Sequence, residues 1–232
     1  MPDSSVTILC TRPVDDSFVE AAAEVGIDLQ ILSFIDTEPV LTIETQQEIE
    51  HALTLSTAVV FTSMNAVEAV ATLVDGEQPD WMVYCMGNTT KKLAEKYFGK
   101  DAVAATGEDA SDLADSIIAD DIGSVVFFCG DVRRNELPDK LEAEEIEVTE
   151  IVVYETIFTP HKIKIPLNGL IFFSPTAVKS FFSVNKVAEN TIIFAIGKTT
   201  ASEVSKFCKN KIIIAAAPAK DQLVEEAITY FS

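Results

Sequence analysis

Few residues of the kinds that build metal sites, disulfides or nucleic-acid interfaces occur in this chain. Its 232 residues contain two histidines, His51 and His161, and neither has a neighbour at ligand spacing, which disfavours a metal site. The four cysteines stand singly in apolar stretches with no C-x-x-C motif, so we expect reduced core residues of a cytoplasmic protein. Only 17 basic residues oppose 37 acidic ones, and the net charge of −20 disfavours nucleic acid or an anionic membrane as a partner.

Long apolar runs are also missing. The longest, such as 212–217, have the length of a strand and fall far short of a membrane span. Residues 1–5 lack the basic start and apolar core of a signal peptide, which also favours the cytoplasm. The sequence has no Ser-His-Asp pattern, no Walker loop and no G-x-G-x-x-G motif. Any chemistry therefore needs neither a strong nucleophile nor a cofactor.

What the chain does have is an internal repeat. The matched segments are 62–67 with 173–178, 87–90 with 197–200, and 112–118 with 222–228. Their separation is nearly constant, as 174 − 63 = 111 and 197 − 87 = 110 show. A second offset of 119 residues links Cys10 to Cys129 and Ile27 to Ile146. The two offsets predict two copies of one α/β unit, with a ligand cleft between like lobes.

Strand-like and helix-like segments alternate along the chain, which predicts a doubly wound α/β fold with two lobes of five mostly parallel strands. The expected strands are 6–10, 27–34, 58–62, 81–86, 102–105, 125–129, 148–154, 170–173, 192–196 and 212–215. The expected helices are 16–25, 45–53, 63–74, 91–98, 112–119, a helix within 130–145, 176–184, 200–207 and 220–231.

The order of the repeated pieces predicts discontinuous lobes. An opening β-α-β unit is copied near residue 124, whereas the three-strand unit stands directly before that copy and again after it. Lobe 1 is then 1–35 with 165–232, lobe 2 is 40–155, and the connectors are 36–39 and 156–164. Both connectors contain proline and fall at matching places, Thr37 and Thr156. A tandem arrangement cut near residue 120 is the alternative, and it requires residues 1–35 and 58–105 to share one sheet.

Small polar residues and glycines follow the predicted strands at their carboxyl ends, where open α/β sheets bind ligands. Helix starts there favour anions, and proline suits the first helical position. The candidate residues are Ser63, Asn65, Gly87, Thr90, Gly130, Ser174, Pro175, Thr176, Gly197, Lys198, Thr199 and Thr200. Serine and threonine are also the usual helix caps, so a purely structural role stays open for each of them.

Three larger side chains are candidates at the same strand ends. Arg12 follows the first strand, and Arg134 stands in the matching turn of the other lobe. Arginines here are suited to carboxylates, although Arg12 is equally suited to a surface ion pair with Asp15 or Asp16. Tyr154 ends its strand just before a connector. It is either a catalytic group or an interior aromatic whose hydroxyl bonds to the backbone.

Taken together, these segments resemble the uroporphyrinogen-III synthase family. The resemblance extends over essentially the whole chain and is carried by 8–13, 60–67, 130–137, 153–156, 173–178 and 195–201. The chain departs from the family pattern at Cys129, where an arginine often precedes the glycine, and at Lys91, where alanine is usual. The resemblance implies two flavodoxin-like lobes joined by a two-strand connector.

The resemblance also implies the reaction. Linear hydroxymethylbilane loses its hydroxyl, ring D is attacked through a spiro intermediate, and the macrocycle closes with ring D inverted. By motif position, Tyr154 would assist departure of the hydroxide and Thr200 would supply a hydroxyl from the other lobe. Amides at Ser63, Gly87, Ser174 and Gly197 would bind the carboxylates, with Arg12 as part of the countercharge. We expect a monomer without cofactor or metal that contacts the preceding pathway enzyme transiently.

Two other functions fit the residues. A two-lobed small-ligand binding or sensor module without catalysis predicts the same fold and the same strand-end residues. A fused flavodoxin-like or receiver-like pair that acts through protein contacts is the third interpretation. It is disfavoured because the sequence has no flavin-phosphate loop and no evident cluster of strand-end aspartates.

Overall fold

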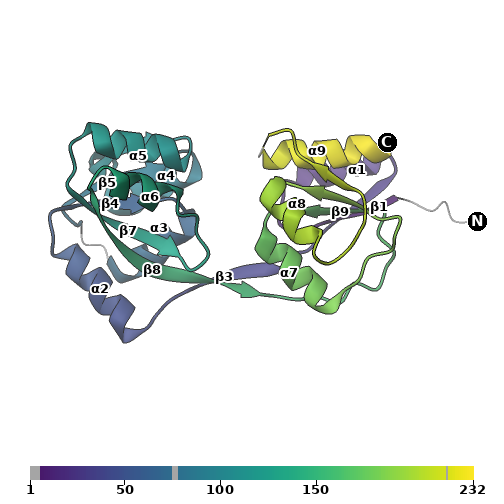
Figure 1. Cartoon of the computed structure of the whole chain (residues 1–232), viewed down its shortest axis with the longest axis horizontal. Helices are drawn as coiled ribbons and strands as arrows, with labels where there is room; N and C mark the ends of the chain where they lie inside the picture. The colour runs from purple at the N-terminus through teal and green to yellow at the C-terminus, as the bar shows by residue number, and fades with distance from the viewer. Residues whose placement is uncertain (1–5, 75–77, 218) are drawn as a thin grey trace, which may run out of the picture. The chain divides into compact units, whose positions relative to one another are not determined.

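Apolar runs rich in β-branched and aromatic residues form two separate sheets, as these side chains favour strands covered on both faces. The computed structural model describes residues 6–74, 78–217 and 219–232, so the expectation of no signal peptide in residues 1–5 lies outside the described residues. Contacts divide the chain into two compact units (Figure 1). Unit 1 consists of the described residues of Met1–Asp36 and Ile157–Ser232, and unit 2 of those of Thr37–Thr156.

The sheet of unit 1 has five parallel strands. They are β1 (Val6–Cys10), β2 (Ile27–Ile31), β9 (Gly169–Phe172), β10 (Ile192–Ala195) and β11 (Ile212–Ile214), in the order β11-β10-β9-β1-β2. From β1 the chain proceeds to β2 in one direction, and from β9 to β10 and β11 in the other. The topological switch point of unit 1 therefore lies between β1 and β9.

Helices cover both faces of this sheet. The helices are α1 (Asp16–Glu24), α7 (Pro175–Val184), α8 (Lys198–Val204) and α9 (Lys220–Phe231). Successive strand residues point to opposite faces of the sheet. Ile8 therefore packs on one face, in the cluster with Ala22 of α1 and Leu223 of α9. Leu9 packs on the other face, in the cluster with Phe181 of α7 and Val204 of α8.

The sheet of unit 2 has the same construction with one strand more. It contains β3 (Ile35–Pro39), β4 (Thr57–Phe61), β5 (Trp81–Met86), β6 (Val103–Gly107), β7 (Ser124–Gly130) and β8 (Glu147–Phe158), in the order β3-β8-β7-β4-β5-β6. The pairs among β4 to β8 are parallel. Here the chain runs from β4 to β5 and β6 in one direction and from β7 to β8 in the other. The switch point lies between β4 and β7.

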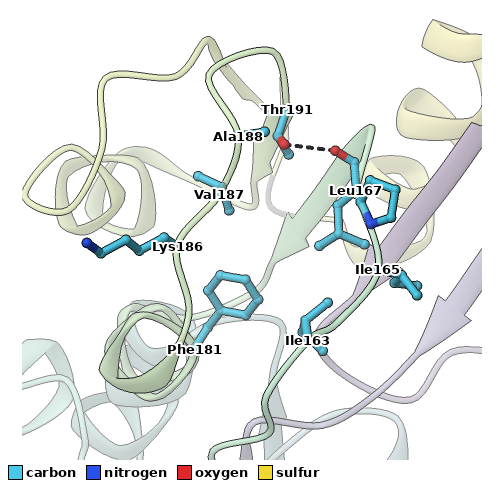
Figure 2. Close-up of a pocket in the computed structure, with 9 residues that line it drawn as sticks. Ile163, Ile165, Leu167, Phe181, Lys186, Val187, Ala188 and Thr191 are labelled. Atoms are coloured by element: carbon cyan, nitrogen blue, oxygen red, sulfur yellow. Dashed lines mark hydrogen bonds between the residues drawn. The ribbon is translucent and has the colours of Figure 1, made fainter.

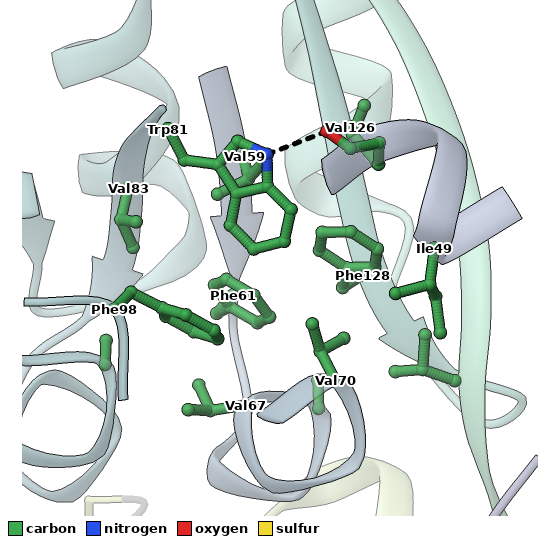
Figure 3. Close-up of a cluster of buried hydrophobic side chains, with 14 of the residues drawn as sticks. Ile49, Val59, Phe61, Val67, Val70, Trp81, Val83, Phe98, Val126 and Phe128 are labelled. Carbon is green, nitrogen blue, oxygen red and sulfur yellow. Dashed lines mark hydrogen bonds between the residues drawn. The ribbon is translucent and has the colours of Figure 1, made fainter. Parts of the chain in front are cut away.

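The helices of unit 2 enclose two apolar clusters, one on each face of the sheet. They are α2 (Ile43–Leu53), α3 (Met64–Val74), α4 (Thr89–Phe98), α5 (Ala110–Ala119) and α6 (Glu136–Ala143), with a short 3-10 helix at Lys100–Ala102. Figure 3 shows the aromatic centre of one cluster, where Phe61 stacks on Phe98 at 5.4 Å and on Phe128 at 5.2 Å. The buried indole N–H of Trp81 donates to the Ala52 carbonyl (2.9 Å), which satisfies the polar atom of this ring.

The predicted α/β class is confirmed, and the differences are local. The described residues form eleven strands where ten were expected, because 35–39 is the strand β3 and not an irregular connector. β3 lies beside β8 in the sheet order, and the amide of Val40 donates to the Val153 carbonyl (2.9 Å). Both segments are half-exposed and have no continuous apolar face, so the sequence pattern did not reveal the pairing. Unit 2 therefore has six strands instead of five.

Candidate functional site

The candidate residues lie at or just beyond the carboxyl ends of the strands, at two matched edges. On unit 1 they follow β1, β9 and β10, and on unit 2 they follow β4, β5, β7 and the parallel-paired part of β8. The residues of the first edge are Arg12, Ser174, Pro175, Thr176, Gly197, Lys198, Thr199 and Thr200; those of the second are Ser63, Asn65, Gly87, Thr90, Gly130, Arg134 and Tyr154. Each edge includes the switch point of its sheet, which is the usual ligand position in open α/β sheets.

The two serines act as helix caps. Ser174 Oγ accepts a hydrogen bond from the amide of Ala177 (3.1 Å), and Ser63 Oγ accepts one from the amide of Asn65 (3.1 Å). Pro175 takes the first position of α7 and brings no N–H. One first-turn amide at each of these helices is thus already paired, so the structural interpretation of the serine oxygens holds in both units.

The two Gly-x-Thr-Thr turns are different. Within the described residues, no side chain caps the start of α4 or α8. Because amides of a first helical turn also have no acceptor inside their own helix, these amides are open to a ligand. Thr90 and Thr200 are buried in these turns, at 7 % and 2 % exposure, and neither hydroxyl hydrogen-bonds to a described residue. Uncapped helix starts with an unpaired hydroxyl are suited to carboxylates.

One amide of these turns is not available. The Gly87 N–H donates to the Gly107 carbonyl (3.0 Å), because the pairing of β5 with β6 continues one residue past β5. The expectation that the Gly87 amide binds a carboxylate is corrected accordingly, and the open amides of this turn come after Gly87. In unit 1 the Gly197 carbonyl accepts from Ala201 (3.0 Å), whereas its own N–H makes no hydrogen bond to the described residues.

Tyr154 packs directly on Gly130. A Cβ built on Gly130 would lie 2.4 Å from Tyr154 Cζ and 2.7 Å from the hydroxyl oxygen, so only glycine leaves room for the ring. A register shift between Cys129 and Gly130 brings Gly130 opposite Tyr154. The tyrosine ring is half-buried, and its hydroxyl donates to no described residue. The expected alternative, an interior aromatic with its hydroxyl on the backbone, therefore does not describe Tyr154.

Arg12 is held by an aromatic ring and not by a carboxylate. Its guanidinium lies 5.6 Å from the centre of the Phe173 ring, and it forms no ion pair with any described residue. The alternative ion-pair partner Asp15 instead accepts from the amide of Ser17 (3.0 Å). Hydrogen bonds from the Ser17 side chain and then from its amide lower the pKa of Asp15. Arg12 is thus a cation at the switch point of unit 1 whose charge no described carboxylate neutralises.

The arginines of the corresponding turn in unit 2 behave differently. Arg134 is exposed and has no ion-pair partner among the described residues. Arg133 forms an ion pair with Glu150, donates to Asn135 Oδ1 (2.5 Å), and is thereby used within its own unit. The hydrogen bond that Arg133 donates to Glu150 raises the pKa of Arg133 above its ordinary value.

The negative charge of the chain is divided unequally between the units. Over the full sequence ranges of the units, 1–36 and 157–232 contain 10 basic and 12 acidic residues, which gives −2, and 37–156 contains 7 basic and 25 acidic residues, which gives −18. These sum to the −20 of the whole chain. A polyacidic ligand therefore meets little net repulsion from unit 1.

A pocket lies elsewhere on unit 1 (Figure 2). It has a volume of about 210 Å³ and is lined mainly by apolar side chains such as Ile163, Phe181 and Val187. Leu167 and Thr191 come just before β9 and β10, so the pocket lies at the amino ends of the strands. The Thr191 hydroxyl donates to the Leu167 carbonyl (2.8 Å). The pocket includes none of the candidate residues, and we place the site at the opposite edge.

No three side chains among the described histidine, cysteine, aspartate and glutamate residues are grouped so that they could hold a metal ion. No helix in the described ranges has the length and apolar character needed to cross a membrane.

The fold and the edges define a class: a doubly wound α/β protein of two repeated units, each with small polar turns at its switch point. The family model for uroporphyrinogen-III synthase HemD matches residues 16–225, and the chain belongs to this family. The activity of the family is that of a cyclising lyase of tetrapyrrole biosynthesis.

Solved structures agree in fold. The uroporphyrinogen-III synthetase from Helicobacter pylori 26695 is 18% identical, with a TM-score of 0.66 over 97% of this chain and 99% of that chain. A mutant uroporphyrinogen III synthase from the extremely thermophilic bacterium Thermus thermophilus is 12% identical, with a TM-score of 0.58 over 98% of this chain and 100% of that chain. The comparison with curated protein sequences gave no match.

Proposed function

We propose that this chain converts hydroxymethylbilane to uroporphyrinogen III, with loss of water and inversion of ring D, and that turns of both units bind the substrate. The observation that carries the proposal is family membership over residues 16–225 together with the uncapped turns at Thr89–Thr90 and Lys198–Thr200. The bilane also closes unaided, but to the uninverted type I isomer. The task of the protein is therefore mainly to hold one conformer for attack at the substituted carbon.

The carboxylates of the substrate are bound chiefly by unit 1 in this proposal. Arg12 supplies positive charge, and the open amides at the start of α8 supply hydrogen-bond donors. The near-neutral balance of unit 1 supports this assignment, because the excess acidic residues belong to unit 2. Thr200 adds a hydroxyl at the same turn that hydrogen-bonds to no described residue.

Tyr154 is proposed to assist departure of the substrate hydroxyl. Its phenolic O–H donates a hydrogen bond to the oxygen of the hydroxymethyl group as the C–O bond breaks. The departing hydroxide and the N–H proton of the same pyrrole together form water, and the exocyclic carbon of that pyrrole is then attacked by ring D. Two observations support this role. The Tyr154 ring packs closely against Gly130, and its hydroxyl donates a hydrogen bond to no described residue. Such a group is positioned by packing and keeps its donor for a ligand.

Separation of the product isomers tests this function. Purified protein is incubated with hydroxymethylbilane, the porphyrinogens are oxidised, and the type I and type III isomers are quantified. An excess of type III over the spontaneous type I product is expected. A binding or sensor module without catalysis would leave type I dominant, and that result would overturn the proposal.

We further propose that the protein works in the cytoplasm as a monomer, without a cofactor, and contacts the preceding pathway enzyme transiently. The reaction supports the absence of a cofactor, since loss of water and ring closure involve no change in oxidation state. The four cysteines are unpaired, and burial raises the pKa of Cys10, Cys85 and Cys129 to about 11. Inert thiols of this kind suit a reducing compartment.

A further inference from the structure

A third cation, Lys220, stands at the same edge of unit 1 as Arg12 and Lys198. Lys220 is the first residue of α9, which follows β11 and packs against β1 and β9. The start of a helix that follows a parallel strand lies near the carboxyl end of the sheet. Lys220 therefore belongs to the edge that includes the β1–β9 switch point, although it lies outside every motif that the sequence suggested.

The charge of Lys220 is offset only in part, by the neighbouring Asp221. Neither Lys220 nor Arg12 forms an ion pair with any described residue. Partial burial of the ammonium group lowers the pKa of Lys220, and the positive charge of Arg12 lowers it further, whereas Asp221 opposes the shift. More than a third of the Lys220 surface remains accessible, so the group can meet a ligand. An anion bound between two cations offsets their mutual repulsion and stabilises the charged form of both.

We propose that Lys220 and Arg12 form a two-cation site that binds one carboxylate of hydroxymethylbilane on unit 1. The inference rests on the proposed function for the identity of the ligand. Arg12 offers a planar guanidinium anchored on Phe173, and Lys220 offers a flexible point charge, so the two approach the same carboxylate from different elements. Lys220 is thus a substrate-binding residue and takes no part in bond making.

The experiment compares Lys220→Gln, Lys220→Arg and the control Lys209→Gln. Lys209 is also an exposed lysine of unit 1, but it lies in the segment between α8 and β11, at the amino ends of the strands. Binding of uroporphyrin III, a fluorescent octacarboxylate, is measured by quenching at two salt concentrations, and isomer formation is measured with hydroxymethylbilane. Circular dichroism and thermal unfolding confirm that each variant folds.

The expected result is a loss of roughly 10-fold in uroporphyrin III affinity and a similar rise in KM for Lys220→Gln, with kcat unchanged. Lys220→Arg should recover most of the affinity, and Lys209→Gln should stay within about 2-fold of the parent protein. The affinity of Lys220→Gln should also depend less steeply on salt. A merely structural role would lower thermal stability without this split between KM and kcat.

Equal affinity of Lys220→Gln and Lys209→Gln would overturn the two-cation site while the parent protein still produces type III, which leaves the proposed function intact. A parent protein that produces no type III excess would instead remove the proposed function. The two failures are therefore distinguishable in one set of measurements.

Discussion

The two units repeat one scaffold but carry different charges on its edge. Unit 1 places cations at three positions where unit 2 has an acid or a neutral residue. The offsets of 119 and 110 residues align Arg12, Lys198 and Lys220 of unit 1 with Asp131, Asn88 and Ala110 of unit 2. Duplication preserved the folding signals, since both serine caps and both buried threonines are present, whereas the charged positions diverged.

The difference teaches how a strongly acidic chain can bind a polyacid. Asp131 has a structural role in this turn, because its Oδ1 accepts from the amide of Thr156 (2.8 Å) and ties the end of β7 to β8. That turn of unit 2 instead presents Tyr154 against Gly130. We therefore assign anion binding mainly to unit 1 and assistance to bond breaking mainly to unit 2.

The largest effect is expected for Tyr154→Phe, which tests the chemical half of this division. Loss of the hydroxyl removes a hydrogen-bond donor needed only as the substrate hydroxyl departs, so kcat should fall roughly 100-fold while uroporphyrin III affinity changes little. Stopped-assay kinetics with isomer separation provide the measurement. Tyr97→Phe, on the helix α4 of the same unit, is the control and should keep the parent kcat. Unchanged turnover in Tyr154→Phe would remove this residue from the mechanism.

Gly130→Ala and Gly197→Ala compare the packing of the two edges. The added methyl group at Gly130 would overlap the Tyr154 ring at 2.4 Å, so the free energy of unfolding should fall by about 1–3 kcal/mol and kcat should fall as the ring is displaced. Gly197 has an extended backbone, with φ −177°, and nothing lies within 4 Å of its added Cβ. That variant should change stability by less than about 1 kcal/mol. Urea unfolding followed by circular dichroism distinguishes the two; equal losses would contradict the packing argument.

Arg12→Gln and Arg134→Gln compare the charge of the two edges. Arg12 has no counterion among the described residues and stands in the near-neutral unit, so its loss should weaken uroporphyrin III binding by roughly 10-fold. Arg134 is exposed in a unit of net charge −18, and its loss should cost less than about 3-fold. Fluorescence titration measures both. A larger loss for Arg134 would reverse the assignment of anion binding to unit 1.

Much of this organisation follows from local sequence signals. β1, β5 and α9 begin and end at the residues that the apolar patterns predict, since these elements bury whole runs of side chains. β3 was missed because it is ordered by backbone pairing with β8 and not by an apolar face. Pairing of this kind depends on a partner more than 100 residues away, which no local pattern records.

The candidate site, too, could be predicted only in part from local sequence signals. The Gly and Thr positions of the turns were predictable from the repeat, but the use of the Gly87 amide by Gly107 was not, because it depends on the register of β5 and β6. Lys220 was missed for a similar reason. Its relation to Arg12 arises from the packing of α9 against β1, and no sequence motif links the two residues.

The smallest effects are expected at the serine caps, where the two units should be alike. Ser63→Ala and Ser174→Ala each remove one cap acceptor at 3.1 Å, and each should lower the free energy of unfolding by about 1 kcal/mol. Because these oxygens are already paired with helix amides, uroporphyrin III affinity should change by less than about 3-fold in either variant. Urea unfolding and fluorescence titration measure the two quantities separately. A large loss of affinity in one variant only would show that this serine also contacts the ligand. The two serines would then differ in function between the units, as the charged positions do.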